Sequence, residues 1–355
     1  LTGKAAGQVA DEVLENLRQK NVYYKKEKFR HDYPHCWRCG APLLFRSVDE
    51  WYINMSWRSE IMEVVKQIRW IPEWGQDQEL NWLENMHDWM ISKKRFWGLA
   101  LPIFECECGW FDVIGGYDEL KQRALEGWEK FEGQSPHRPW VDAIRIKCEK
   151  CGGLAKRIPD VGNPWLDAGI VPYSTVKYNT DKEYWQKWIP ADLVLECFPG
   201  QFRNWFYALL SMSTMMENQR PFKTLLGHAL VRDENGQEMH KSTGNAIWFD
   251  EAAEKMGADV MRWIYCNHNP TNNLNFGYTI GDQVRRRVFS TWWNVYSFFV
   301  NYARLDGFDP QRPAVPYEQL QDIDRWLLSK LQVLIRTANE SLADFNVAAL
   351  VQCAD

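Results

Sequence analysis

The amino-acid sequence predicts an α/β protein with a cysteine-rich insertion and an α-helical C-terminal part, and three observations lead to this expectation. Between residues 192 and 266, apolar runs suited to strands alternate with longer helical patterns, which is typical of a parallel sheet. Six of the nine cysteines occur as close pairs. From about residue 283 onwards, the spacing of apolar residues is helical to the end of the 355-residue chain.

The N-terminal part of the chain contains several expected helices and one stretch expected to be rich in strand. Residues 11–20 predict a capped helix, because Asp11 precedes an apolar stripe. Residues 42–55 combine an apolar run with an aromatic run, which predicts strand. Further helices are expected at about residues 58–69 and 79–91.

The alternation that indicates a parallel sheet begins at residue 192. Residues 192–198 are an apolar run bounded by turn residues, which predicts a buried strand. A long apolar helix is expected at residues 201–218, and a second strand is expected at residues 222–231. The segment 250–266 then predicts one or two helices.

The composition is that of a globular protein with two or three domains, and it argues against several classes of protein. The chain is 45% hydrophobic and 25% charged. It has no apolar run long enough for a membrane span, and its first residues lack an apolar signal core, so a cytoplasmic location is expected. The net charge of −5 argues against a protein that coats DNA, although local basic patches still allow a nucleic acid to bind.

Two of the cysteine pairs predict a structural zinc site. Close spacing lets two sulfurs of one turn reach the same ion, and a glycine after each pair suits a sharp turn. Four thiolates close a tetrahedral site around Zn²⁺ and leave no open position for catalysis. Four unrelated buried thiols are the alternative. The residues concerned are Cys106, Cys108, Cys148 and Cys151.

A third pair, Cys36 and Cys39, forms a similar knuckle without a matching pair in this sequence. The remaining ligands of a metal here would be His31 and His35, single cysteines elsewhere, or cysteines on a part of the protein that this chain lacks. A plain turn with solvent-exposed histidines is the alternative interpretation.

The segment 236–245, GQEMHKSTGN, has the composition of a phosphate-binding loop. It contains two glycines, and Lys241 is followed by two hydroxyl residues. Such groups can hold phosphates, but the same composition also suits an ordinary polar surface loop.

Seven segments, in the same order along the chain, resemble the class I aminoacyl-tRNA synthetases, and their wording is closest to the isoleucyl branch of that family. They extend over nearly the whole chain, and the valyl and leucyl branches share part of the set. The segments are YPHCWRCGAPL, WMISKKRFWGLALPIF, PDVGNPWLDAG, ECFPGQFRNWFY, GHALVRDENGQEMHKSTGN, ADVMRW and DRWLLSKL.

The resemblance implies the second half of a Rossmann-like parallel sheet, with a zinc-knuckle insertion and an α-helical C-terminal domain. Residues 1–55 would be the end of a connective or editing insertion and carry the Cys36 knuckle, and residues 56–190 would be the catalytic-domain connection with a zinc-binding insertion. Residues 191–282 would be the second half of the nucleotide-binding domain with its signature loop, and residues 283–355 the truncated start of the anticodon-binding domain. The family's His-x-Gly-His signature does not occur in the sequence, so the first half of the catalytic domain is expected to be missing.

The activity implied by the resemblance is that of an isoleucine–tRNA ligase. Such an enzyme uses ATP with Mg²⁺ to convert isoleucine to isoleucyl-adenylate and then transfers the amino acid to tRNA(Ile). The chain alone is expected to be inactive, because its partner, the N-terminal catalytic half, is missing. Lys93, Lys94 and Arg95 are candidate contacts for the acceptor end of the tRNA. The alternatives are a non-catalytic, synthetase-like tRNA-binding or partner module, and a zinc-held scaffold without a nucleotide role.

The loop at 236–245 corresponds to the family's Lys-Met-Ser-Lys-Ser signature. By resemblance, Lys241 and Ser242 would bind the phosphates of ATP and stabilise the negative charge that develops as pyrophosphate leaves. Glu238 stands where the family has its first lysine. Its carboxylate is therefore expected either to point away from the phosphates or to weaken activation.

The remaining site residues implied by the resemblance lie near the ends of the two expected strands. Glu196 and Gln201 would hold the amino acid or the ribose, and Trp205 would line the side-chain pocket unless it is simply a core aromatic residue. Gly227 and His228 would lie near the adenine, although a lone histidine is equally compatible with a structural role.

Overall fold

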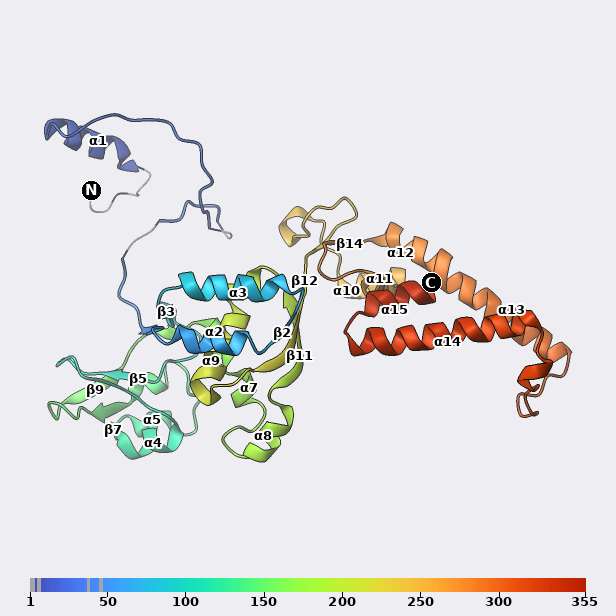
Figure 1. Cartoon of the computed structure of the whole chain (residues 1–355). Coiled ribbons are helices and arrows are strands. Elements are labelled where there is room, and N and C mark those ends of the chain that lie inside the picture. The colour runs from blue at the N-terminus through green and yellow to red at the C-terminus, as the bar shows by residue number, and fades with distance from the viewer. Residues whose placement is uncertain (1–3, 5–7, 37–38, 45–46) are drawn as a thin grey trace. The chain divides into compact units, whose positions relative to one another are not determined.

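The structure is a computed structural model that describes residues 4, 8–36, 39–44 and 47–355. The chain divides into two compact units, Leu1–Asp49 and Glu50–Asp355, whose elements are shown in Figure 1. In the described ranges, no helix combines the length and the apolar character needed to cross a membrane.

In its described residues, the first unit contains one helix and one tight turn. The helix α1 (Ala10–Gln19) confirms the helix expected at residues 11–20, but the expected cap is wrong, because Val9 is the N-cap, without a side-chain hydrogen bond, and Asp11 lies inside the first turn. At the knuckle, the N–H of Cys36 donates to the carbonyl of Ala41, and the N–H of Gly40 donates to the carbonyl of Cys36, both at 2.8 Å. Gly40 has a φ of +70°, a left-handed conformation that favours glycine.

A three-stranded parallel sheet forms the centre of the second unit. Its order is β11–β12–β2, with strands β2 (Arg69–Ile71), β11 (Ala191–Cys197) and β12 (Phe222–His228). The strands expected at 192–198 and 222–231 are therefore confirmed, and β2 is a strand that the sequence pattern did not predict.

The strand β11 is not buried, contrary to the prediction from its apolar residues. Among the described strands it pairs only with β12, so it lies at an edge of the sheet. Leu193 is 37% exposed and Leu195 is 51% exposed. An apolar run does not distinguish a central strand from an edge strand, because burial depends on the neighbours that the strand finds in the fold.

Three helices contribute to the core around this sheet (Figure 1). They are α2 (Arg58–Val65), α3 (Trp74–Asn85) and α9 (Trp205–Glu217). Their apolar faces meet in one buried cluster that includes Leu83 and Phe206. The predicted apolar helix thus forms as α9, after a short 3₁₀ turn.

The region around α3 differs from the prediction in two ways. The helix starts and ends earlier than the expected helix at 79–91, because the chain turns into strand β3 (Trp89–Met90). β3 pairs with β1 (Tyr52–Ile53). In the described part of the stretch 42–55, the only strand pairings are those of β1 and of a single bridge at Pro42. The prediction that this stretch is rich in strand is therefore largely wrong.

The insertion between residues 103 and 157 is a small domain with its own antiparallel sheet. A separate buried core, which includes Phe104, Phe131 and Ile146, lies against this sheet. The strand order is β6–β5–β9–β8–β7, and the elements are β5 (Ile103–Glu105), β6 (Phe111–Val113), α4 (Tyr117–Arg123), β7 (Ala124–Glu126), α5 (Trp128–Phe131), β8 (Arg145–Lys147) and β9 (Leu154–Arg157).

The chain after β12 forms a small α/β layer. Strand β13 (Val231–Arg232) pairs in parallel with β14 (Leu274–Asn275). Between them lie α10 (Phe249–Met256) and α11 (Ala258–Asn267), so the segment 250–266 forms two helices. Residues of these helices and Phe276 share a third buried cluster.

The C-terminal part is helical, as its sequence pattern predicts. Its helices are α12 (Tyr278–Val284), a π-helical turn (Arg285–Phe289), α13 (Ser290–Leu305), α14 (Asp322–Ala343) and α15 (Val347–Ala354). α15 packs against α14 and α11 (Figure 1). Apolar side chains remain exposed on α13 and α14, among them Trp293 and Leu327.

Candidate functional site

Two of the predicted site residues meet where the parallel strands end. Glu196 of β11 is the register partner of Gly227 on β12, and the next pair is Cys197 and His228. The Nε2 atom of His228 lies 3.9 Å from Oε1 of Glu196, and both side chains are about one-third exposed. The carboxyl ends of parallel strands are where ligands bind in such sheets, so both side chains are placed to contact one.

The structure gives a steric reason for a glycine at residue 227 that the sequence pattern did not reveal. A Cβ atom at this position would lie 2.4 Å from ring atoms of Phe198. The N–H of Phe198 donates to the carbonyl of His228 at 2.8 Å, which extends the pairing of β11 with β12 by one bond and holds the Phe198 ring against Gly227. Any side chain at residue 227 would displace this ring.

Gln201 and Trp205 connect the strand end to helix α9. The side-chain oxygen of Gln201 accepts a hydrogen bond from the backbone N–H of Trp205 at 3.1 Å, at the start of the helix. The indole N–H of Trp205 donates to the carbonyl of Ala168 at 3.3 Å. Trp205 also packs against the main core, as expected for a core aromatic residue. It remains partly exposed, so the side-chain pocket role is still open to it.

The signature loop is folded around Asp233 and Asn245. One side-chain oxygen of Asp233 accepts the N–H groups of Asn235 and Gln237, each at 2.9 Å. Its other oxygen accepts from the amide of Asn245 at 2.8 Å. The Asn245 amide and the backbone N–H of Gln237 together lower the pKa of Asp233.

Asn245 also connects to the centre of the loop. Its amide nitrogen donates to the carbonyl of Glu238 at 3.0 Å. Its side-chain oxygen accepts from the N–H of His240 at 3.0 Å and from the hydroxyl of Thr243 at 2.7 Å. One side chain therefore ties both ends of the loop to its middle.

The charged groups of the loop lie on its surface. The Lys241 ammonium lies 4.7 Å from the centre of the Trp248 ring, and the lysine is exposed. The Glu238 carboxylate lies 3.3 Å from Nε2 of His240. Lys241 begins a 3₁₀ turn that ends at Thr243, and the side chain of Ser242 lies outside the described part of the structure.

A hollow of about 670 Å³ lies against this loop. Its lining is polar and mixes one guanidinium with two carboxylates, so it is a solvent-filled recess of the surface. The lining residues are Arg232, Asp233, Gly236, Gln237, Glu238, His240, Thr243 and Asn245.

Four cysteines of the insertion meet as their spacing predicts. The sulfurs of Cys106 and Cys151 lie 3.6 Å apart, as do those of Cys108 and Cys148. All four sulfurs are within 4.8 Å of one another, which is compatible with a single tetrahedral metal ion.

The protonation of these thiols fits a metal site. The N–H of Cys108 lowers the pKa of Cys106, but burial and the neighbouring thiols raise it to about 12. Burial raises the pKa of Cys148, but backbone N–H groups of Cys151 and Lys150 and the adjacent thiols lower it to about 7. A divalent cation would remove this competition, because it stabilises all four thiolates together.

The Cys36 knuckle has the same backbone pattern as one of these pairs. The N–H of Cys148 donates to the carbonyl of Gly153, and the N–H of Gly152 donates to the carbonyl of Cys148. Cys36, Ala41 and Gly40 form the equivalent bonds in the first unit. In the described part of the chain, however, no metal-compatible group of three or more ligands includes Cys36 or Cys39.

Comparison with known proteins identifies the family. Residues 10–277 match the family model for tRNA synthetases class I (I, L, M and V). The chain belongs to the class I tRNA synthetases.

Relatives of this class I synthetase chain include isoleucine–tRNA ligases. That of Thermus thermophilus is 37% identical over 340 residues, which are 94% of this chain and 32% of the relative. That of Saccharolobus solfataricus is 34% identical over 341 residues, which are 94% of this chain and 34% of the relative. The chain thus spans about a third of the length of the relatives it matches.

Solved structures support the fold of this synthetase chain. Methionyl-tRNA synthetase of Mycobacterium tuberculosis, in complex with methionyl-adenylate, matches 90% of the chain with a TM-score of 0.59 and 15% identity, over 52% of its own length. The agnB2 LeuRS of Agrobacterium radiobacter K84, in a ternary complex with tRNA and LeuAMS, matches 76% with a TM-score of 0.56 and 21% identity, over 35% of its own length.

Sequence reasoning missed the residues that hold the synthetase loop in shape. Asp233 and Asn245 carry most of its side-chain hydrogen bonds, yet only Lys241 and Ser242 were predicted as site residues. The signal was present in the sequence Asp233-Glu234-Asn235-Gly236, because Asp, Asn and Gly are typical of turns in which the Asp side chain accepts backbone N–H groups.

Proposed function

We propose that this chain is the part of an isoleucine–tRNA ligase that carries the second half of the ATP site and the signature loop. The identity to isoleucine–tRNA ligases over 94% of the chain supports the choice of isoleucine and tRNA(Ile) as substrates. The observation that carries the proposal is the exposed Lys241 ammonium, held on the loop after strand β13, which itself begins shortly after β12 ends at His228. Residues 191–282 would form this half of the catalytic domain.

The proposed chemistry is the attack of the isoleucine carboxylate on the α-phosphate of ATP. A new bond forms between a carboxylate oxygen and the phosphorus, and pyrophosphate leaves. The Lys241 ammonium would leave the Trp248 ring and neutralise charge on the departing phosphates, where a preorganised cation lowers the barrier. Glu196 and His228 would contact the adenylate at the strand ends, and Mg²⁺ would enter with ATP as part of the substrate.

Zinc has a structural role in this proposal. Cys106, Cys108, Cys148 and Cys151 would hold Zn²⁺ and join the turn between β5 and β6 to the turn between β8 and β9. The Cys36 knuckle would take its remaining ligands from the N-terminal catalytic half that a longer protein supplies. The four-part division at residues 55, 190 and 282 follows from the same proposal.

The experiment is isoleucine-dependent exchange of pyrophosphate into ATP by a chimera. In it, this chain replaces the matching third of the Thermus thermophilus relative. Lys241→Ala is expected to lower the exchange rate roughly 100- to 1,000-fold, the usual cost of losing one group that stabilises the transition state. Lys255→Ala, on the nearby helix α10, is the matched control and should leave the rate unchanged. Equal effects of the two substitutions would contradict the proposal.

A second candidate function, a non-catalytic tRNA-binding or partner module, is favoured by Glu238. A unit charge about 8 Å from a phosphate interacts by about 2 kcal/mol at an effective dielectric constant of 20, here in the unfavourable direction. In the structure, the carboxylate faces His240. Glu238→Lys in the same chimera should therefore raise exchange about tenfold or more if the loop acts on ATP. An unchanged rate would favour the non-catalytic module.

A further inference from the structure

Two segments distant in sequence form an exposed aromatic surface beside the zinc-binding insertion. Trp97 is 68% exposed and Phe96 is 57% exposed. The Trp97 ring stacks on His137, with ring centres 5.4 Å apart and an interplanar angle of 16°. The Arg138 guanidinium lies 4.7 Å above the ring of Phe96. We call Phe96, Trp97 and His137, with Arg95 and Arg138 beside them, the stacking patch.

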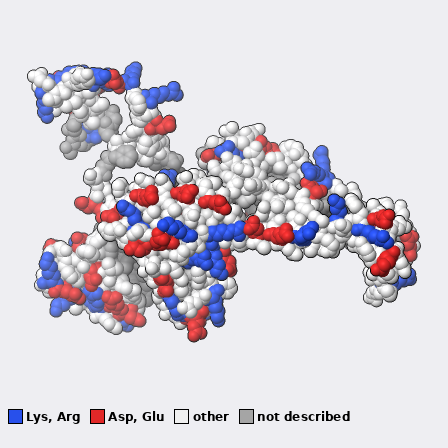
Figure 2. Space-filling model, viewed as in Figure 1, with Lys and Arg blue, Asp and Glu red and all other residues white. Residues whose placement is uncertain are grey.

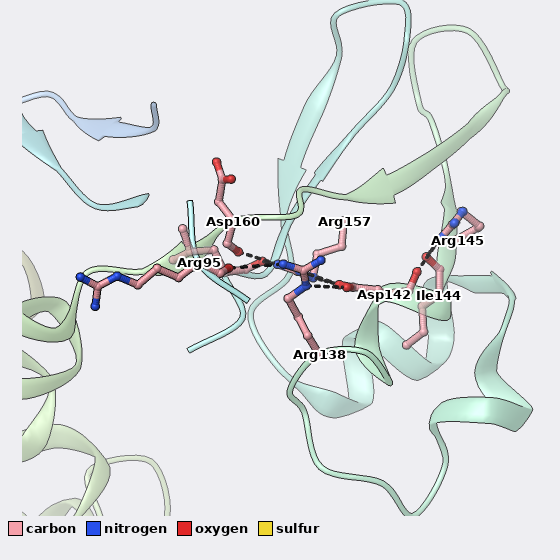
Figure 3. A network of polar contacts seen from close by, with 8 residues as sticks. Arg95, Arg138, Asp142, Ile144, Arg145, Arg157 and Asp160 are labelled. Carbon is pink, nitrogen blue, oxygen red and sulfur yellow. Dashed lines mark hydrogen bonds and ion pairs between the residues drawn. The ribbon is translucent and has the colours of Figure 1, made fainter. Parts of the chain in front are cut away.

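A partly buried network of charges fixes the two segments to each other (Figure 3). Arg138 donates to the carboxylate of Asp142 at 2.8 Å and to the carbonyl of Arg95 at 3.3 Å. Asp142 also accepts from Nε of Arg157 at 2.6 Å. The Arg157 side chain is completely buried, and it donates to the carbonyl of Asp160 at 2.9 Å. The aromatic faces are therefore presented by a rigid support.

Exposed large aromatic side chains are costly to keep in water, so a supported group of them indicates a binding surface. Trp97 is too exposed to have both faces covered, and His137 occupies only one of them. An open indole face beside a guanidinium is the arrangement on which nucleobases stack while the cation contacts the backbone phosphate.

The charge around the patch favours an anionic partner. The three carboxylates in and next to the network belong to Glu50, Asp142 and Asp160. Each of them is bound by a basic or hydroxyl group. Arg95 points away from the network in Figure 3, and its side chain makes no ion pair with any residue in the described ranges. The network and the adjoining segment 93–95 together contain five cationic residues, Lys93, Lys94, Arg95, Arg138 and Arg157, and three acidic ones, Glu50, Asp142 and Asp160.

This local excess contrasts with the rest of the surface. Figure 2 shows acidic and basic side chains interspersed over the displayed face, and the whole chain has a net charge of −5. The net charge of the whole protein therefore does not attract an anion. Attraction has to come from the basic residues next to the exposed rings of the stacking patch.

We propose that the stacking patch binds unpaired bases at a single-stranded RNA end, with a base on the open face of Trp97 and a phosphate at Arg95. The choice of RNA rests on the proposed function, since a tRNA ligase handles an RNA end. The patch itself rests on the geometry of residues 95–97 and 137–138. It adds His137, Phe96 and Trp97 to the lysines and arginine that the sequence alone indicated.

The test measures the affinity of the whole chain for a short, fluorescein-labelled single-stranded RNA by anisotropy. Trp97→Ala is expected to weaken binding roughly 5- to 150-fold, the loss expected for one stacked base. Trp97→Phe keeps a ring and should restore most of the affinity. Trp188→Ala removes a tryptophan that is 56% exposed on another helix, and it should leave binding unchanged.

Arg95→Ala separates the charge from the ring. It should weaken binding and reduce the slope of log affinity against log salt concentration by about one, as for one lost phosphate contact. The same RNA annealed into a duplex should bind more weakly, because its bases are already stacked on each other.

Three outcomes would overturn the inference: no binding of single-stranded RNA, equal loss in Trp97→Ala and Trp188→Ala, or equal affinity for the duplex. A protein partner as the true occupant would give the first of these. Unfolding temperatures of the variants should match that of the parent chain, because the substituted side chains are exposed. RNA affinity is measured independently of isoleucine activation. If the chimera catalysed pyrophosphate exchange but Trp97→Ala left the RNA affinity unchanged, this inference would be rejected and the proposed function would stand.

Discussion

Glu79 is the residue whose surroundings conflict most with its chemistry. It lies on α3 with no exposed surface, and neither carboxylate oxygen has a hydrogen-bond partner among the described residues. The neighbouring hydroxyl of Tyr207 has no partner there either. Burial raises the pKa of Glu79 well above its usual value of 4.5, so the protonated form is favoured in the folded protein.

Glu79→Gln is therefore expected to stabilise the protein at about pH 8 but not at about pH 4. At a pH below the pKa of Glu79 in the unfolded chain, the carboxyl is protonated in both states, and its ionisation does not change the free energy of unfolding. As the pH rises, the unfolded state gains stability by losing a proton that the folded state retains. Thermal unfolding of the variant and the parent at the two pH values is the measurement.

The matched control for this prediction is Glu84→Gln on the same helix, where the glutamate is exposed. Its effect should be small and similar at both pH values. If Glu79→Gln gave the same change in unfolding temperature at both, the carboxylate would not be titrating as a buried group.

Gly227 shows how a single residue can have two explanations. The sequence resemblance placed it near the adenine, whereas the structure gives a steric reason that needs no ligand, the approach of the Phe198 ring. His228 differs, because its ring faces Glu196 and remains partly exposed at the strand end. Only the contacts of each residue separate packing from availability to a ligand.

At the scale of elements, the loop between β13 and α10 combines one β-bridge and one 3₁₀ turn with a set of side-chain hydrogen bonds. Gly236 and Gly244 have φ values of +78° and +75°, which explains why glycines occur at both positions. Asn245, which follows Gly244, binds the two ends of the loop to its centre.

Asn245→Ala is expected to loosen this loop while leaving the rest of the protein folded. It removes several hydrogen bonds, each worth about 1 kcal/mol, so the open state of the loop should become at least about fivefold more populated. Trypsin cleavage after Lys241, followed by mass spectrometry, measures this population.

Asn235→Ala is the control in the same turn, because the structure records only a backbone bond for Asn235. Its cleavage rate should stay close to that of the parent. An Asn245→Ala loop that resisted trypsin as well as the parent would show that the backbone alone maintains the loop.

At the scale of the whole molecule, the insertion has its own core and its own sheet. The four cysteines meet in the turns between strands of that sheet. A sheet this small buries little apolar surface, and metal binding is a common means of stabilising such domains. We expect the purified chain to hold about one zinc ion in this cluster.

Removal of the zinc by a chelator should lower the unfolding temperature of the insertion, and Cys148→Ala should have the same effect without a chelator. Cys353→Ala, at an exposed cysteine of α15, should change neither metal content nor stability. Metal analysis together with calorimetry provides the measurement. A chain whose unfolding did not respond to chelation would contradict a structural role for zinc.

The sequence by itself determined the features that depend on short-range spacing. The cysteine pairs, the loop around Lys241 and the order of strands and helices between residues 191 and 267 were predictable, because turns, knuckles and hydrophobic periodicity involve residues close together in the chain.

Only the tertiary structure decided which distant residues meet. It placed β11 at the edge of the sheet, brought Glu196 within 3.9 Å of His228, buried Glu79 and stacked Trp97 on His137. The physical reason is that burial and contact between distant segments depend on how whole elements pack, which no local pattern of residues encodes.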